Sequence, residues 1–298
     1  MSCRNYLLAL DGSRESLSAT NIALSLSEYE HAKLTAISVI DTKSIWALLE
    51  CGAPGLIGSG PYVNAFEQIK ASLRSISEAL LSSFETRAQA SQTAPECTIV
   101  EGDPVHEIFE RSSNYNLIIT GRRHNLHGHS KNGSYYRSSL TKRLAAVCAC
   151  PLLIVASEKN IQKARLIVDV ATFNAELMAE FCSLAKSAKL LPEIFCVGED
   201  LNVDNLVRGV KKVVDSTVKV LCSDGTDGDE PFAVAVDVSA DTVLVIPTAQ
   251  TLEGRVTSGG MLVHDLFGIT SPASILLLPP GFAKSNMREN EKELSASK

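Results

Sequence analysis

The sequence lacks the features of secreted, membrane-spanning and nucleic-acid-coating proteins. Its 298 residues carry 34 acidic and 28 basic side chains, which gives a formal net charge of −6. Nucleic acids and anionic membranes select basic surfaces, so we expect neither as a partner. The apolar run at residues 6–10 is too short for a signal-peptide core, and no stretch approaches the roughly 18 apolar residues of a membrane helix. We therefore expect a cytoplasmic protein.

The cysteine spacings of zinc-knuckle and redox sites are also missing, as are common catalytic motifs. Of the eight cysteines only Cys148 and Cys150 lie close together, as C-A-C rather than CxxC. Ordinary reduced thiols, several of them in the core, fit a reducing compartment. GxSxG, HExxH and GxxxxGK followed by Ser or Thr are absent as well. We identify no catalytic residue and expect a sensor or binding protein rather than an enzyme.

What the sequence does contain is a regular alternation of strands and helices. The apolar run at residues 6–10 is typical of a strand buried on both faces of a parallel sheet. Ser13 can cap the helix that follows, and Asp103-Pro104 supplies a cap and a first-turn proline for another. The pattern predicts a doubly wound α/β fold. Strands are expected at 6–10, 34–40, 97–100, 116–120 and 151–156, and helices at 14–27, 64–88, 104–112 and 138–149.

After a polar stretch at 157–163 the same alternation begins again. Residues 230–246 repeat the pattern of residues 103–120. Taken alone, residues 232–238 favour a strand, but their position in the repeat corresponds to a helix. We therefore predict a helix there. We expect two tandem domains at 1–157 and 158–280 and a disordered tail at 281–298, the alternative being one large sheet without internal symmetry. The second set comprises strands at 165–170, 193–197, 218–222, 243–246 and 274–278 and helices at 174–189 and 202–214.

The segment from Gly121 to Ser139 is the strongest candidate for a ligand site. It follows the fourth predicted strand, leads into a helix and lies in a stretch, between Glu110 and Glu158, that has no acidic residue. Ligands of open parallel sheets sit beyond the carboxyl ends of the strands, and helix N-termini favour anions. We expect an anion site here, the alternative being a solvated basic loop. Seven cations lie within the acid-free stretch, at Arg111, Arg122, Arg123, Lys131, Arg137, Lys142 and Arg143.

The same segment contains three histidines in an HxxHxH arrangement, His124, His127 and His129. Imidazole nitrogens bind Zn, Ni or Cu. However, no cysteine or carboxylate lies nearby in the loop, and the surrounding cations repel a metal ion. Phosphate contact or solvation is the better interpretation, so we expect no metal.

Several short motifs together resemble the universal stress protein family. They are LALDGSRES at 8–16, VIDT at 39–42, GDP at 102–104, IITG at 118–121 and SSLTKRLAAVCACPLLIV at 138–155. The resemblance covers residues 4–157 and continues more faintly over 164–280. It implies two adenine nucleotide alpha hydrolase-like domains in tandem, an arrangement that is common in the family.

The resemblance also implies a nucleotide site in the first domain. ATP-binding members carry a glycine, two residues, a glycine, nine residues and a third glycine followed by Ser or Thr. Here Gly121 keeps the first place, His124 replaces the second glycine, Ser138-Ser139 form the final pair, and the spacing is longer. The family's ATP binders have an aspartate at the adenine or ribose end. The implied ligand is ATP or AMP, and the candidate site residues are Asp11, Val39, Gly121, Arg122, His124, Ser138, Ser139 and Leu140.

Alternatives remain at single residues and for the function as a whole. Asp11 can instead cap the turn before the first helix. The second domain has Asp169 in the place of Asp11, but Pro247 in the place of Gly121 and Arg255 as its lone cation, so its site is degenerate. We expect a stress-response sensor that binds an adenine nucleotide and possible homodimers of the chain. The alternatives are a ligand-free dimerising scaffold and a slow ATP hydrolase.

Overall fold

The computed structural model divides the chain into two compact units, Met1–Leu144 and Ala145–Lys298, which are described separately. Within the part of the chain that the structure describes, no helix is both long enough and apolar enough to cross a membrane. The described residues are 4–50, 60–90, 94–122, 140–156, 161–169, 174–198, 200–214, 217–223, 231–252, 254–257, 262–266, 273–280 and 282.

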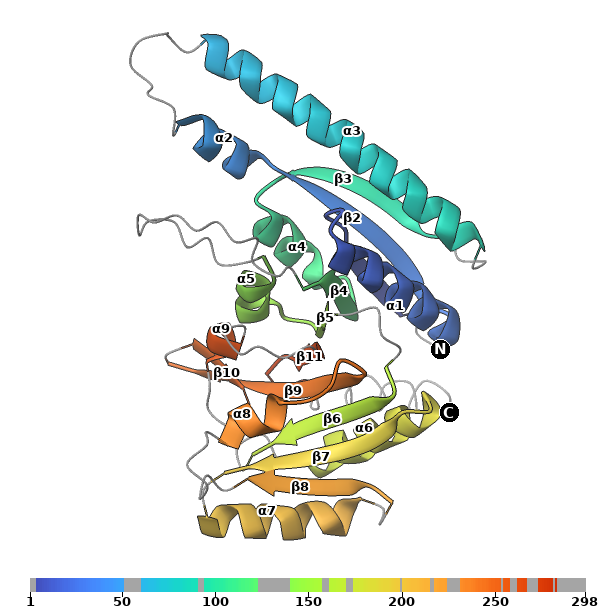
Figure 1. Cartoon of the computed structure of the whole chain (residues 1–298), viewed down its shortest axis with the longest axis vertical. Helices are drawn as coiled ribbons and strands as arrows, with labels where there is room; N and C mark the ends of the chain where they lie inside the picture. Colours follow the sequence, from blue (N-terminus) through green and yellow to red (C-terminus); the bar gives the residue numbers. More distant parts are fainter. Residues whose placement is uncertain are drawn as a thin grey trace, which may run out of the picture. The chain divides into compact units, whose positions relative to one another are not determined.

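The first unit is built on four parallel strands in the order β3-β2-β1-β4, of which Figure 1 labels β2, β3 and β4. They are β1 (Asn5–Ala9), β2 (Lys33–Asp41), β3 (Glu96–Gly102) and β4 (Leu117–Gly121). Leu7 and Leu8 of β1 and Ile118 and Ile119 of β4 are fully buried. A strand that is covered on both faces has a continuous run of apolar residues, so the sequence pattern predicted β1 and β4.

Helices connect these strands, and two of them begin with predicted caps. They are α1 (Arg14–Glu30), α2 (Thr42–Glu50), α3 (Gly60–Ala90) and α4 (Pro104–Ser112), while α5 (Leu140–Val147) crosses the boundary between the units. Ser13 caps α1 by accepting a hydrogen bond from the Ser16 amide (3.1 Å), and Asp103 caps α4 by accepting one from the Val105 amide (3.0 Å). Both caps and the α/β fold class are therefore confirmed.

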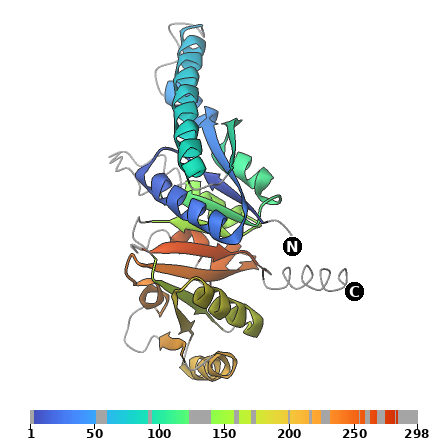
Figure 2. The ribbon, with the colours of Figure 1, turned by 90° about the vertical axis from the view of Figure 1, so that its right-hand side faces the viewer.

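Helix α2 is absent from the sequence-based assignment, which left residues 42–50 without an element. It packs against α3, where the rings of Trp46 and Phe66 stack with centroids 4.4 Å apart. Ile40, Ile45 and Phe66 form a small buried cluster beneath it. Figure 2 shows α3 continuing past the strands, with α2 beside this extension. The helix predicted at 64–88 is confirmed and is longer at both ends.

The second unit contains strands in the order β5-β11-β9-β6-β7-β8. Strand β11 is antiparallel to β5, β10 is antiparallel to β9, and the remaining pairs are parallel. The path β8-β7-β6-β9 repeats the relative order β3-β2-β1-β4 of the first unit. The strands are β5 (Leu152–Val155), β6 (Lys163–Val168), β7 (Leu191–Val197), β8 (Lys219–Ser223), β9 (Thr242–Thr251), β10 (Gly254–Thr257) and β11 (Ser274–Leu278).

The helices of the second unit include the one that was inferred from the repeat register. Helix α8 (Pro231–Val236) buries Phe232 and Ala235 almost completely, so its apolar composition imitates that of a buried strand. The helix that the internal repeat predicted in this segment is therefore confirmed. The other helices are α6 (Ala175–Ser187), α7 (Asp200–Val213) and α9 (Val263–Leu266). Of the expected disordered tail, all residues except Phe282 lie outside the described part.

Candidate functional site

The strand order of the first unit reverses between β1 and β4. From β1 the chain proceeds outward to β2 and β3 on one side, and β4 lies on the other side. The register pairs Ala9 with Thr120, so the residues that follow β1 and those that follow β4 leave the sheet side by side. In open parallel sheets ligands bind at this reversal, beyond the carboxyl ends of the strands. We call this edge, formed by residues 10–13 and 121–122, the switch-point edge.

Asp11 lies on the switch-point edge and organises the turn into α1. Its carboxylate Oδ1 accepts hydrogen bonds from the Ser13 amide (3.0 Å) and the Ser13 hydroxyl (2.6 Å). Its own amide donates to the Ser16 hydroxyl (3.3 Å). The capping role considered for Asp11 is therefore present in the structure, and the exposed side chain stands at the position where a ligand would lie.

Val39 is half-buried in β2, next to β1 in the sheet. The register pairs Ala9 with Ile37, and continuing it by two residues places Val39 level with Asp11. On the other side of β2, Val39 pairs with Val100 of β3. The strands thus bring two of the candidate residues, 28 positions apart in sequence, to the same level of the sheet.

Gly121 has a structural reason to be glycine. A Cβ placed on it would lie 2.5 Å from the Glu15 carbonyl carbon and 2.5 Å from the Ser16 amide nitrogen. Both are backbone atoms of the first turn of α1, so any side chain would push the helix away from the end of β4. Whatever it contributes to a ligand, Gly121 allows α1 to pack closely on β4.

Arg122 follows directly and brings a buried cation to the switch-point edge. Only 7% of its surface is exposed, and desolvation of the guanidinium lowers its pKa from the usual value. Leu140, the first residue of α5, is half-buried. The remaining candidates, His124, Ser138 and Ser139, lie outside the described residues, as does the rest of the HxxHxH arrangement. Within the described residues no group of three potential metal ligands occurs.

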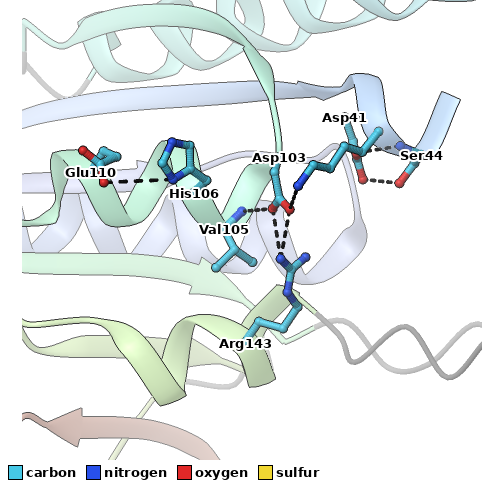
Figure 3. A network of polar contacts seen from close by, with 8 residues as sticks. Asp41, Ser44, Asp103, Val105, His106, Glu110 and Arg143 are labelled. Atoms are coloured by element: carbon cyan, nitrogen blue, oxygen red, sulfur yellow. Dashed lines mark hydrogen bonds and ion pairs between the residues drawn. The ribbon is translucent and has the colours of Figure 1, made fainter. Parts of the chain in front are cut away.

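Asp103 joins three helices at the same end of the sheet (Figure 3). Its carboxylate pairs with Arg143 of α5 (2.9 Å) and Lys43 of α2 (3.2 Å), besides capping α4. Burial by itself would raise the pKa of Asp103, but its hydrogen bonds to Arg143, Lys43 and the Val105 amide lower it to about 2. The sequence revealed only the cap, because the ion pairs connect segments far apart in the chain. Arg143, one of the cations in the stretch without acidic residues, is thus already engaged by a carboxylate.

A second aspartate at this end of the sheet is engaged in the same way. Asp41, the last residue of β2, accepts hydrogen bonds from the Ser44 amide (2.9 Å) and the Ser44 hydroxyl, and so caps the start of α2 (Figure 3). Like Asp11 and Asp103, it is a carboxylate that organises the helix that follows its strand.

The corresponding edge of the second unit has a different structure. Pro247, which stands in the place of Gly121, does not begin a loop, because residues 247–251 continue β9 and residues 248–251 pair with β10 in a hairpin. The guanidinium of Arg255, on β10, donates through Nη1 to the carbonyl oxygens of Ala145 (3.0 Å) and Cys148 (2.7 Å). Burial lowers the pKa of this arginine. The single cation noted for a second anion site is thus bound to backbone carbonyls.

Comparison with known proteins places this geometry in a family. Residues 3–156 match the sequence model of the universal stress protein family. The fold resembles a universal stress protein from Archaeoglobus fulgidus DSM 4304, with a TM-score of 0.62 and 15% identity over 93% of this chain and 96% of that one. It also resembles a protein from Pseudomonas aeruginosa UCBPP-PA14, with a TM-score of 0.56 and 13% identity over 97% of both chains.

Another solved structure, a universal stress protein in complex with cAMP, covers 52% of this chain and 98% of its own length at 19% identity. Its TM-score of 0.36 is too low for any conclusion about this chain. No curated protein sequence matches the chain significantly. At these identities the structural likenesses establish the fold alone.

Proposed function

Because the chain belongs to the universal stress protein family, we propose that it is a stress-response sensor that binds ATP or a related adenine nucleotide in its first unit. The observation that carries the proposal is the meeting of Asp11 with Gly121 and Arg122 at the switch-point edge. The carboxylate of Asp11 is suited to hydroxyl groups of a sugar, and a guanidinium such as that of Arg122 is suited to phosphate oxygens. Val39, level with Asp11, supplies apolar surface for a base.

A binding role fits the carboxylates at this end of the sheet better than hydrolysis does. A hydrolase needs a base that can position and deprotonate a water molecule. Asp11 accepts hydrogen bonds from Ser13, Asp41 from Ser44, and Asp103 is paired with two cations. Each of these carboxylates already holds a helix start in place, so we propose a sensor rather than an ATP hydrolase.

Isothermal titration of the full chain with ATP, AMP and cyclic AMP tests the proposal. We expect heat of binding with at least one of them and weaker binding in Asp11→Ala, by about tenfold or more, since the loss of one hydrogen bond to a charged group costs roughly 1.5–3 kcal/mol. Asn174→Ala is the matched control, because it removes a side-chain cap from α6 in the second unit. Absence of heat in the wild type at millimolar nucleotide would refute the proposal.

We further propose that residues 158–280 are a degenerate second copy of the domain at residues 1–157. The matching order of the strands supports the duplication, and the β9–β10 hairpin in place of a glycine loop supports the loss of its anion site. A cytoplasmic location and a homodimer stay predictions.

One observation favours the second candidate function, a ligand-free scaffold. Strands β5 and β11, the last strands of the two proposed copies, pair antiparallel, with Ile154 opposite Ile275. Domain pairing of this kind needs no ligand. Mass spectrometry of the purified protein after gentle denaturation separates the two functions, because a co-purified nucleotide is expected from a sensor and would exclude the scaffold.

A further inference from the structure

Two cysteines of the second unit lie directly opposite each other in the sheet. Strands β7 and β8 run side by side (Figure 1), and their parallel register pairs Cys196 with Cys222. Residues paired in this way have their side chains on the same face of the sheet. Adjacent strands lie about 4.7–4.9 Å apart, within the range of about 4.4–6.8 Å between the Cα atoms of a disulfide. The backbone therefore meets the spacing that a disulfide requires.

The side chains of this pair also lie close enough to influence each other. The pKa of the Cys196 thiol is raised to about 12, first because burial disfavours its thiolate and second because a charge on Cys222 would repel that thiolate. A repulsion of this kind acts only between groups that are near each other. The electrostatics and the strand register thus indicate the same pair.

The two thiols differ in their access to solvent. Cys222 is exposed, whereas Cys196 has no exposed surface. Among the strands that the structure describes, β8 pairs with β7 alone, because it is the last strand of the sheet. An edge strand can adjust its spacing more readily than a strand that is held on both sides. An oxidant in solution therefore meets Cys222 first and finds a second thiol behind it.

We propose that Cys196 and Cys222 form an oxidation site, in which a hydroperoxide converts the two thiols into a disulfide that fastens the edge strand β8 to β7. In reducing compartments, disulfides are usually transient and catalytic or serve redox sensing. The site gives the protein a response to oxidants that goes beyond the proposed nucleotide binding and needs no ligand in the first unit.

The oxidation proceeds in two steps. In the first, the Cys222 sulfur attacks one oxygen of the hydroperoxide ROOH. An S–O bond forms, the O–O bond breaks, and the products are a sulfenic acid and ROH, which is water when R is hydrogen. In the second, the Cys196 sulfur attacks the Cys222 sulfur, an S–S bond forms, and the hydroxyl group leaves as water with the thiol proton of Cys196. The two sulfurs together lose two electrons, which the peroxide gains.

The second step is the slower one, because the high pKa of Cys196 keeps its reactive thiolate scarce. Its fixed place beside Cys222 compensates for this scarcity, since a positioned neighbour reacts at a high effective concentration. The sulfenic acid on Cys222 should therefore persist long enough to be trapped by dimedone.

Oxidation of the folded full-length protein with hydrogen peroxide tests the proposal. The remaining thiols are blocked with iodoacetamide in urea, and the protein is digested with trypsin without reduction. Cleavage after lysine and arginine places Cys196 in the peptide 190–208 and Cys222 in the peptide 220–255. We expect these peptides to be linked, with the mass of their sum less two hydrogen atoms, and dithiothreitol to separate them.

Three single variants test the assignment of the pair. Cys196→Ala should lose the linked peptide and leave Cys222 as a sulfenic acid that dimedone captures, and Cys222→Ser should lose both products. Cys182→Ala is the matched control, because Cys182 is another buried cysteine of the second unit but lies on α6, outside the strand pair. It should keep the linked peptide. In the oxidised wild type, the amides of β8 should exchange with solvent more slowly than in the reduced protein.

The outcomes that contradict the proposal are distinct. Absence of the linked peptide from the folded wild type, or linkage of Cys222 to a different cysteine, would overturn it. Unchanged exchange of the β8 amides in the linked protein would refute the fastening of the edge strand. None of these measurements involves a nucleotide, so their failure leaves the proposed function standing.

Discussion

Replacing Gly121 by alanine tests the close packing of α1 on β4. The added Cβ would lie 2.5 Å from two backbone atoms of α1, where ordinary contacts begin at 3.4 Å. The first turn of α1 must therefore move by about 1 Å, and overpacking of this kind costs roughly 1–3 kcal/mol. We expect the upper part of this range, because backbone atoms cannot turn aside as a side chain can.

Urea unfolding, monitored by tryptophan fluorescence, measures this loss of stability in the first unit. Trp46 is the single tryptophan and lies in the first unit, so its emission reports the unfolding of that unit. Gly60→Ala is the control, since a Cβ there has no atom within 4 Å and lies at the start of α3. A Gly121→Ala midpoint equal to that of Gly60→Ala would refute the packing argument. A large loss would also mean that substitutions of Gly121 cannot serve as tests of nucleotide binding.

Three further predictions concern other contacts. Asp103→Asn keeps the helix cap but loses the ion pairs, so it should lower the free energy of unfolding by about 1–2 kcal/mol at pH 7. This figure allows for solvent screening of the ion pairs, since Lys43 and Arg143 are exposed. Because folding lowers the pKa of Asp103 from 3.8 to about 2, this difference should vanish in urea titrations as the pH falls through that window, and a constant difference would contradict the ion pairs. Phe66→Ala should cost about 3 kcal/mol and shift the emission of Trp46 to the red, whereas unchanged emission would contradict the ring stack. Iodoacetamide at pH 8 should modify exposed Cys222 faster than Cys196, whose pKa burial raises to about 12, and equal rates by peptide mass spectrometry would show that Cys196 is accessible.

The sequence predicted those parts of the fold that local patterns encode. Strands β1 and β4 are buried on both faces, so their apolar runs located them. Ser13 and Asp103 cap helices through contacts with residues two or three positions away, which a local pattern contains. Helix α2 was missed because its nine residues depend on the stack of Trp46 on Phe66, a contact that no short window of sequence displays.

The sequence predicted which strand ends form the candidate site. It did not predict which side chains contact one another there. The strand-end rule placed Asp11 and Gly121 at one edge, and the strand register agrees. The contact of Gly121 with the backbone of α1 and the pair between Asp103 and Arg143 join segments distant in sequence, so spacing could not reveal them. The same holds for Arg255, whose acceptors lie more than 100 residues earlier.

A crystal structure of the full chain soaked with ATP tests the central claim most directly. The account predicts density for the nucleotide beyond the carboxyl ends of β1 and β4, with the sugar near Asp11 and the phosphates toward Arg122 and the first turn of α5. Nucleotide density at another edge of the sheet, or an unliganded structure from crystals soaked at millimolar ATP with this edge open to solvent, would contradict it.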